Sequence, residues 1–210
     1  NNYITEAENF GNGIVYNDST DIWQLVDGAN WEFPFGKLES IALDDHPVTQ
    51  VSWNDALAYC ECYNKTLPSE VQWEYAASER GQKKNQLFYW GNDLVVNNNY
   101  MCNTWATGYP NTIGYEDGFK YTSPISYFTA NSLGIYDMAG NVWEWCYNWH
   151  LPYEGNLEVF PLDLQGRAQR GGSFLCNSNY CHGYRLSARS ATSPESSLFH
   201  VGFRCVKNIK

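Results

Sequence analysis

The stretch that most constrains the fold is NNNYMCNTWATGYPNTIGYEDGFKYTS, residues 97–123. It follows neither the 3.6-residue period of a helix nor the alternation of a strand, and its Asn, Gly and Thr residues favour irregular loops. A long stretch without regular structure needs something to hold it inside a compact domain. Asn and Asp side chains offer oxygen ligands, so the sequence suggests a hard cation bound within this stretch.

The composition agrees with a loop-rich fold. A chain of 210 residues can bury one substantial core, so we expect a single domain over residues 1–210. Aromatic residues make up 17% of the chain, and 17 Gly and 8 Pro interrupt it often, which indicates an α+β domain rather than a bundle or a doubly wound sheet. The net charge of −10 argues against a nucleic-acid partner, and no apolar run is long enough for a membrane span.

The first predicted helix covers residues 51–65. Ser52 followed by Asp55 resembles a capping box in which Asp replaces Glu. The apolar stripe of this helix consists of Trp53, Ala56, Leu57 and Cys60. We therefore expect Cys60 to face the core and Cys62, about 200° further round the helix, to face away from it.

The rest of the predicted regular structure is one more helix and four short strands. The helix covers residues 67–81, with Ser69 and Gln72 as its capping pair and Gly81 near its end. The strands are predicted in a small antiparallel sheet, at residues 140–149, 170–175, 184–190 and 201–206.

The segment RGGSFLCNSNYC, residues 170–181, presents Cys176 and Cys181 five positions apart. This spacing matches neither a C-x-x-C redox site nor the paired knuckles of structural zinc. A local disulfide, a pair of inert buried thiols, a redox pair and a soft-metal site are all compatible with it. Two thiolates alone suit Cu(I) better than Zn²⁺, which takes four ligands.

Several strings in one order resemble the formylglycine-generating enzymes, the sulfatase-modifying-factor family. The resemblance runs from Tyr3 to Val206, and it implies a C-type-lectin-like fold that here lacks the family's N-terminal strand and helix. The strings that carry it are NNYITEAENFG, DGANWEFP, HPVTQVSWNDALAYC, LPSEVQWEYAA, YDMAGNVWEW, RGGSFLCNSNYC, ARSATSPESS and VGFRC.

The resemblance implies an oxidase that converts the cysteine of a C-x-P-x-R motif, in a nascent or unfolded sulfatase, into Cα-formylglycine. Cu(I) would be held by Cys176 and Cys181, with the substrate thiolate as third ligand; dioxygen would be the oxidant and an external thiol the reductant. Ser173 and Tyr180 align with active-site residues that could position oxygen or water. Trp143 aligns with the aromatic wall of the oxygen pocket.

The resemblance also implies two structural Ca²⁺ sites and one disulfide. The first calcium site would use Asn103 and Asp117 with the backbone carbonyls of Thr104 and Phe119. The second would use Asp137 and Glu144 with the carbonyls of Gly140 and Val142. Mixed carboxylate, amide and carbonyl oxygens suit Ca²⁺, although solvated loop carboxylates are common in any acidic protein. The implied disulfide joins Cys60 to Cys205 and favours an extracytoplasmic location, either the periplasm or the lumen of the endoplasmic reticulum.

Two other functions compete with the oxidase. A non-catalytic lectin-like binding module could use the same fold, but it has no reason to keep Cys176 and Cys181 together with Ser173 and Tyr180. An iron-dependent sulfoxide synthase would need a histidine-rich metal domain, which four His in the chain do not supply.

Overall fold

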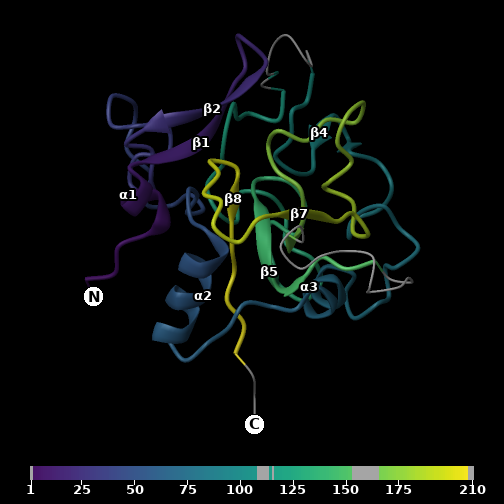
Figure 1. Cartoon of the computed structure of the whole chain (residues 1–210). Helices are drawn as coiled ribbons and strands as arrows, with labels where there is room; N and C mark the ends of the chain where they lie inside the picture. The colour runs from purple at the N-terminus through teal and green to yellow at the C-terminus, as the bar shows by residue number, and fades with distance from the viewer. Residues whose placement is uncertain (1, 108–113, 115, 153–165, 208–210) are drawn as a thin grey trace.

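The computed structural model describes residues 2–107, 114, 116–152 and 166–207. Its regular elements are few and short, joined by long loops (Figure 1). The helices are α1 (Glu6–Phe10), α2 (Trp53–Cys62) and α3 (Glu70–Ala77). The strands are β1 (Asn12–Asn17), β2 (Ile22–Asp27), β3 (Val95–Val96), β4 (Asn99–Tyr100), β5 (Trp143–Trp149), β6 (Arg167–Arg170), β7 (Ser190–Thr192) and β8 (Val201–Gly202). The loop-rich α+β prediction is confirmed. Within the described residues, no helix is long and apolar enough to cross a membrane.

The central sheet has four strands in the order β7-β6-β5-β8. Strands β5, β6 and β7 pair antiparallel, but β8 runs parallel to β5, so the sheet is mixed and the antiparallel prediction was wrong for its last strand. Helix α2 packs against β5, and α3 packs against β5 and β6. Figure 1 shows both helices beside β5. The β1–β2 hairpin forms a separate two-stranded sheet on the other side of the molecule from α3.

Local hydrogen bonds explain where the helices begin. In α2 the Ser52 hydroxyl accepts the Asp55 amide, and the Asp55 carboxylate accepts the Ser52 amide, as the capping box predicted. Cys60 is buried and Cys62 is exposed, so the predicted helix phase is confirmed. Helix α3 has its predicted cap but ends at Ala77, before Gly81. Helix α1, with its own capping box, and the β1–β2 hairpin were not predicted.

Two predicted strands are wrong for identifiable reasons. Strand β6 stops at Arg170 because Gly171 and Gly172 adopt positive φ angles of 93° and 74°, which turn the chain out of the sheet. A Cβ on Gly172 would lie 2.4 Å from the backbone nitrogen of Tyr184, so only glycine fits there. Residues 184–189 form turns, and the strand near them begins only at Ser190.

A buried ion-pair network fixes the end of β6, just before the cysteine loop. The Arg170 side chain is fully buried and donates to Glu70 of α3 at 3.2 Å and to Glu74 at 2.6 Å. Arg189 donates to the same Glu70 carboxylate through Nη2 at 2.7 Å and through Nε. One carboxylate thus joins α3, β6 and the segment before β7, which holds the start of the cysteine loop against the core.

Candidate functional site

The two cysteines of the C-x4-C segment lie on one turn that follows β6. Cys176 is 1% exposed and Cys181 is partly buried. Asn177 organises the turn, because its carbonyl accepts the Cys181 amide at 2.9 Å and its side chain donates to the Trp105 carbonyl at 2.8 Å. The Trp105 amide in turn donates to the Cys176 carbonyl at 3.0 Å. The spacing therefore serves a turn anchored to the core at Trp105.

The two thiols are in hydrogen-bond contact and differ in acidity. Burial raises the pKa of Cys176 well above its usual value, so this thiol keeps its proton. The hydrogen bond from Cys176, helped by the Gly183 amide, outweighs the effect of burial and lowers the pKa of Cys181 to about 7. The Ser173 amide also donates to the Cys176 sulfur at 3.5 Å. A neutral thiol beside a thiolate supplies two sulfur donors, which suit a soft ion such as Cu(I).

Trp143 and Gly183 close one side of the thiol pair. Trp143, on β5, is 6% exposed. A Cβ on Gly183 would lie 2.4 Å from the Trp143 ring and 2.8 Å from the Cys176 sulfur, so the ring and the sulfur pack against the bare backbone of this glycine. Sequence reasoning missed Gly183, although its place two residues after Cys181 was a usable signal.

Ser173 and Tyr180 are placed differently from each other. Ser173 is fully buried, and its hydroxyl accepts the Leu175 amide at 3.2 Å, while its own amide faces Cys176. Tyr180 precedes Cys181 on the turn and is 73% exposed. The structure thus brings together Cys176, Cys181, Ser173 and Trp143, and leaves the Tyr180 side chain at the surface.

The residues of the first predicted calcium site converge. Both Asp117 oxygens accept backbone amides, from Thr104 at 2.7 Å and from Phe119 at 3.1 Å. Burial raises the pKa of Asp117 to about 6, partly offset by these hydrogen bonds. Asn103 is fully buried, and its Oδ1 has no hydrogen-bond partner among the described residues. A buried carboxylate beside an unsatisfied amide oxygen fits a cation with oxygen ligands.

The second predicted calcium site already has a positive charge. Asp137, Val142 and Glu144 line one cavity of about 420 Å³, but Arg204 lines it too. Both carboxylate oxygens of Glu144 accept hydrogen bonds from Arg204, and Oε2 also accepts Trp73 Nε1 at 2.6 Å. Gly140 packs on the backbone of Asn103, which joins the two loops. No group of three or more His, Cys, Asp or Glu side chains forms a metal site within the described part of the chain. These residues fit a cation less well than the first set.

The two cysteines of the implied disulfide are also brought together. The sulfur atoms of Cys60 and Cys205 lie 2.7 Å apart, whereas a disulfide bond is about 2.05 Å long. Cys62 faces away at the surface of α2. The structure therefore supports the choice of partners, and the covalent bond stays a prediction.

The fold and the site together define a class, a loop-rich α+β domain with a buried cysteine pair at the end of a small mixed sheet. The chain belongs to the family described as "Sulfatase-modifying factor enzyme 1-like domain", whose model matches residues 2–209. It is 40% identical to the formylglycine-generating enzyme of Mus musculus over 97% of this chain, and it spans 59% of that relative's length. It is 34% identical to a Mus musculus relative named "Inactive C-alpha-formylglycine-generating enzyme 2", over 98% of this chain and 68% of the relative.

A solved structure, PvdO from Pseudomonas aeruginosa, has a similar fold. The TM-score is 0.60 with 24% sequence identity, over 80% of this chain and 63% of PvdO. At this identity the likeness supports the fold alone.

Proposed function

We propose that this chain is a formylglycine-generating oxidase, which converts the cysteine of a C-x-P-x-R motif in sulfatase polypeptides into Cα-formylglycine. The observation that carries the proposal is the thiol pair itself, in which buried Cys176 donates a hydrogen bond to Cys181 and lowers its pKa to about 7. Relatives named formylglycine-generating enzyme support the same function, although the chain spans only 59% of the length of the mouse enzyme.

The chain's own residues would prepare the site for an incoming cysteine. Cys181 is only partly buried, so a substrate sulfur can approach it, and its pKa of about 7 leaves about half of it ionised at neutral pH. Cys176 stays behind it, held by the Ser173 amide and by its backbone bond to Trp105. Trp143 covers one side of the pair, and such an apolar wall would keep water away from the reacting atoms.

Cu(I) held by Cys176 and Cys181 would supply a third coordination position for the substrate thiolate and the means to activate dioxygen. The net reaction removes the substrate sulfur as hydrogen sulfide and forms the aldehyde. Dioxygen would take two electrons and two protons from the substrate and two of each from outside, and form two water molecules. The resulting thioaldehyde would then hydrolyse to the aldehyde and hydrogen sulfide, so water would supply the aldehyde oxygen. An external thiol is the proposed source of the electrons, and the compartment is proposed to be extracytoplasmic.

We also propose Ca²⁺ at the first loop site, because Asp117 is buried without a side-chain cation among its hydrogen-bond partners and Asn103 Oδ1 is unsatisfied. Calcium there would hold the irregular stretch around residues 103–119 against the turn that carries Gly140. At the second site, Arg204 already neutralises Glu144, so any calcium would bind more weakly.

A non-catalytic binding module is the second candidate. Two observations favour it, the 73% exposure of Tyr180 and the relative named as inactive. Retention of both Cys176 and Cys181 in one buried pair favours the oxidase.

The test is incubation with copper, a thiol reductant, dioxygen and a peptide that contains C-x-P-x-R, followed by mass analysis. The peptide should lose its sulfur and gain an aldehyde, and a peptide with Ser in place of Cys should not react. Cys176→Ser and Cys181→Ser should each abolish turnover and the binding of about one Cu(I). The matched control is Cys62→Ser, which removes an exposed thiol on α2. Aldehyde formation by the double cysteine variant would refute the oxidase mechanism.

A further inference from the structure

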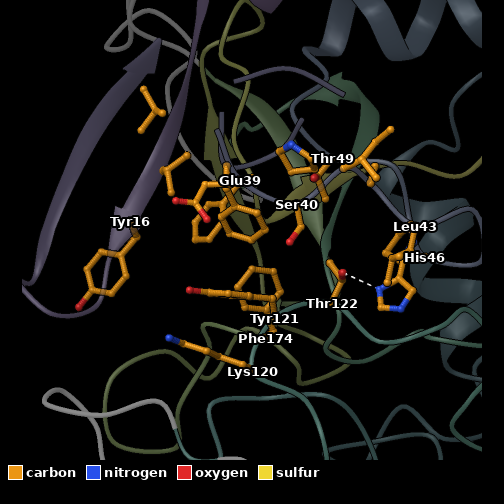
Figure 2. Close-up of a pocket in the computed structure, with 18 of the residues that line it drawn as sticks. Tyr16, Glu39, Ser40, Leu43, His46, Thr49, Lys120, Tyr121, Thr122 and Phe174 are labelled. Atoms are coloured by element: carbon orange, nitrogen blue, oxygen red, sulfur yellow. Dashed lines mark hydrogen bonds between the residues drawn. The ribbon is translucent and has the colours of Figure 1, made fainter. Parts of the chain in front are cut away.

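A cavity of about 730 Å³ lies beside the β1–β2 hairpin, and its lining includes none of Cys176, Cys181, Ser173 and Trp143. Figure 2 shows it between the hairpin, residues 34–49 and residues 120–122. Four aromatic rings that pack edge to face or tilted against one another line it, those of Phe35, Tyr121, Phe174 and Phe199. An aromatic floor of this size can accept a large apolar side chain.

The wall of the cavity also carries a hydroxyl group. Thr49 lines the cavity and is 3% exposed, and its hydroxyl is not among the fully buried groups that lack a partner. His46 is satisfied by the Thr122 hydroxyl at 2.8 Å, and Lys120 pairs with Asp18 at 3.1 Å. A hydroxyl at the cavity wall can hydrogen-bond a ligand that has a polar group next to its apolar part. A peptide backbone has that combination.

The surface around the cavity is both acidic and apolar. Asp18 and Glu39 line the cavity, and Asp44 and Asp45 directly follow the lining residue Leu43 in the chain, whereas Lys120, which also lines it, pairs with Asp18. Leu38 is fully exposed, and Ile41 and Leu43 on the rim are 55% and 58% exposed. Exposed apolar side chains of this size mark a surface that binds another molecule, and the charge calls for a basic one. A second copy of this acidic chain would be repelled.

The cavity adjoins the cysteine loop through Phe174, which lies on that loop, and through Tyr16. Tyr16 lines the cavity, and its ring centroid lies 6.1 Å from that of Trp105. The Trp105 amide donates to the Cys176 carbonyl, so Trp105 links Tyr16 to the thiol turn. An extended chain that reaches the thiols could continue over Tyr16 into the cavity.

We propose that this cavity is an exosite for the unfolded sulfatase polypeptide, which binds an apolar side chain next to Lys or Arg residues outside the C-x-P-x-R motif. The proposal rests on the proposed function, because it takes the same polypeptide as partner. The aromatic floor binds the apolar side chain, the Thr49 hydroxyl meets the peptide backbone, and carboxylates such as Glu39 attract the basic residues.

The experiment measures binding without turnover. Two fluorescein-labelled peptides of about thirty residues, up to about 100 Å when extended, carry S-x-P-x-R in place of the reactive motif. One has flanks rich in Leu, Phe and Lys, and the other has Gly-Ser flanks. Measured by fluorescence anisotropy, the first peptide should bind at least about tenfold more tightly than the Gly-Ser peptide. Added salt should reduce this difference in affinity.

Two variants locate the exosite. Ser40→Trp fills the cavity from its exposed edge and should weaken binding of the Leu/Phe/Lys peptide about tenfold. Glu39→Gln should weaken it about two- to threefold at low salt. The controls are Asn85→Trp and Glu61→Gln, which make the same kinds of change at exposed positions outside the cavity and should leave the affinity unchanged.

The outcomes separate this inference from the oxidase. Equal binding of the two peptides, or equal weakening by Ser40→Trp and Asn85→Trp, would overturn the exosite even if aldehyde formation is observed. The exosite would also be overturned if the wild type self-associates with rising concentration and Ser40→Trp does not, while Ser40→Trp still binds the peptide. The cavity would then bind a second copy of the chain. If the protein forms no aldehyde but still prefers the Leu/Phe/Lys peptide through this cavity, the exosite is supported and the oxidase function is refuted.

Discussion

The Glu70 network gives the sharpest prediction about stability, and the perturbation is Glu70→Gln. Glu70 is 6% exposed, and its carboxylate accepts hydrogen bonds from Arg170, Arg189 and Asn148. The substitution keeps the side-chain volume and removes the charge. It leaves fully buried Arg170 with Glu74 as its remaining carboxylate, and that carboxylate is 43% exposed.

Breaking a buried ion pair by removing one partner costs about 3–5 kcal/mol, because the other charge stays buried and uncompensated. Arg170 keeps Glu74 and the Leu186 carbonyl, so we expect the lower end of that range, about 3 kcal/mol. For a chain of this size the melting temperature should fall by about 6–12 °C. Glu74→Gln, which removes a partly exposed carboxylate, should cost about 1 kcal/mol or less.

The effect should also depend on pH. Burial alone would raise the pKa of Glu70, but the hydrogen bond and charge of Arg189 and the charge of Arg170 hold it below its usual value. A lowered folded-state pKa stabilises the protein above the ordinary pKa of about 4.3, and this contribution is lost as the pH falls through the folded-state value. The difference between wild type and Glu70→Gln should therefore be constant from pH 8 to about 5 and shrink below about pH 4.

Urea unfolding of the two variants and the wild type, at pH 7 and at acid pH, measures these differences. A Glu70→Gln protein no less stable than Glu74→Gln would show that the shared carboxylate does not hold the network together. A difference that grows as the pH falls would refute the assigned charge states.

The remaining predictions concern calcium, the disulfide and the thiol pocket. Chelation should lower the melting temperature, because calcium at 100 times its dissociation constant adds about 2.7 kcal/mol to the free energy of unfolding. Asp117→Ala should remove most of this response, and an equal response in that variant would contradict the site. Peptide mapping without reduction should recover Cys60 linked to Cys205, and recovery of a different link would contradict the assigned partners. Gly183→Ala should cost about 1–3 kcal/mol and weaken Cu(I) binding, because its Cβ would collide with Trp143 and the thiol; unchanged copper affinity would place this glycine outside the pocket.

The sequence predicted the features that depend on neighbours in the chain. The Ser52 and Ser69 caps and the orientation of Cys60 were all correct, because capping boxes and helical stripes involve residues three or four positions apart. Composition predicted the loop-rich α+β class for a similar reason, since Gly, Pro and Asn act on the local backbone.

Features that depend on distant contacts were missed or wrong. The strand at residues 170–175 fails because Gly172 must pass close to Tyr184. Strand β8 runs parallel to β5 because the last segment returns beside Trp143, which no local pattern reveals. The hairpin escaped prediction because its second strand is mostly exposed and lacks alternation.

For the candidate site, the sequence by itself determined which residues could do chemistry, namely the cysteine pair and the oxygen-rich loop. The tertiary structure alone decided their chemical state. Burial and one hydrogen bond divide two similar thiols into a protonated Cys176 and an acidic Cys181, and the partly buried Arg204 guanidinium distinguishes the Glu144 loop from the Asp117 loop. Acidity and charge balance depend on the local dielectric and on partners far away in sequence, and the folded chain alone brings these together.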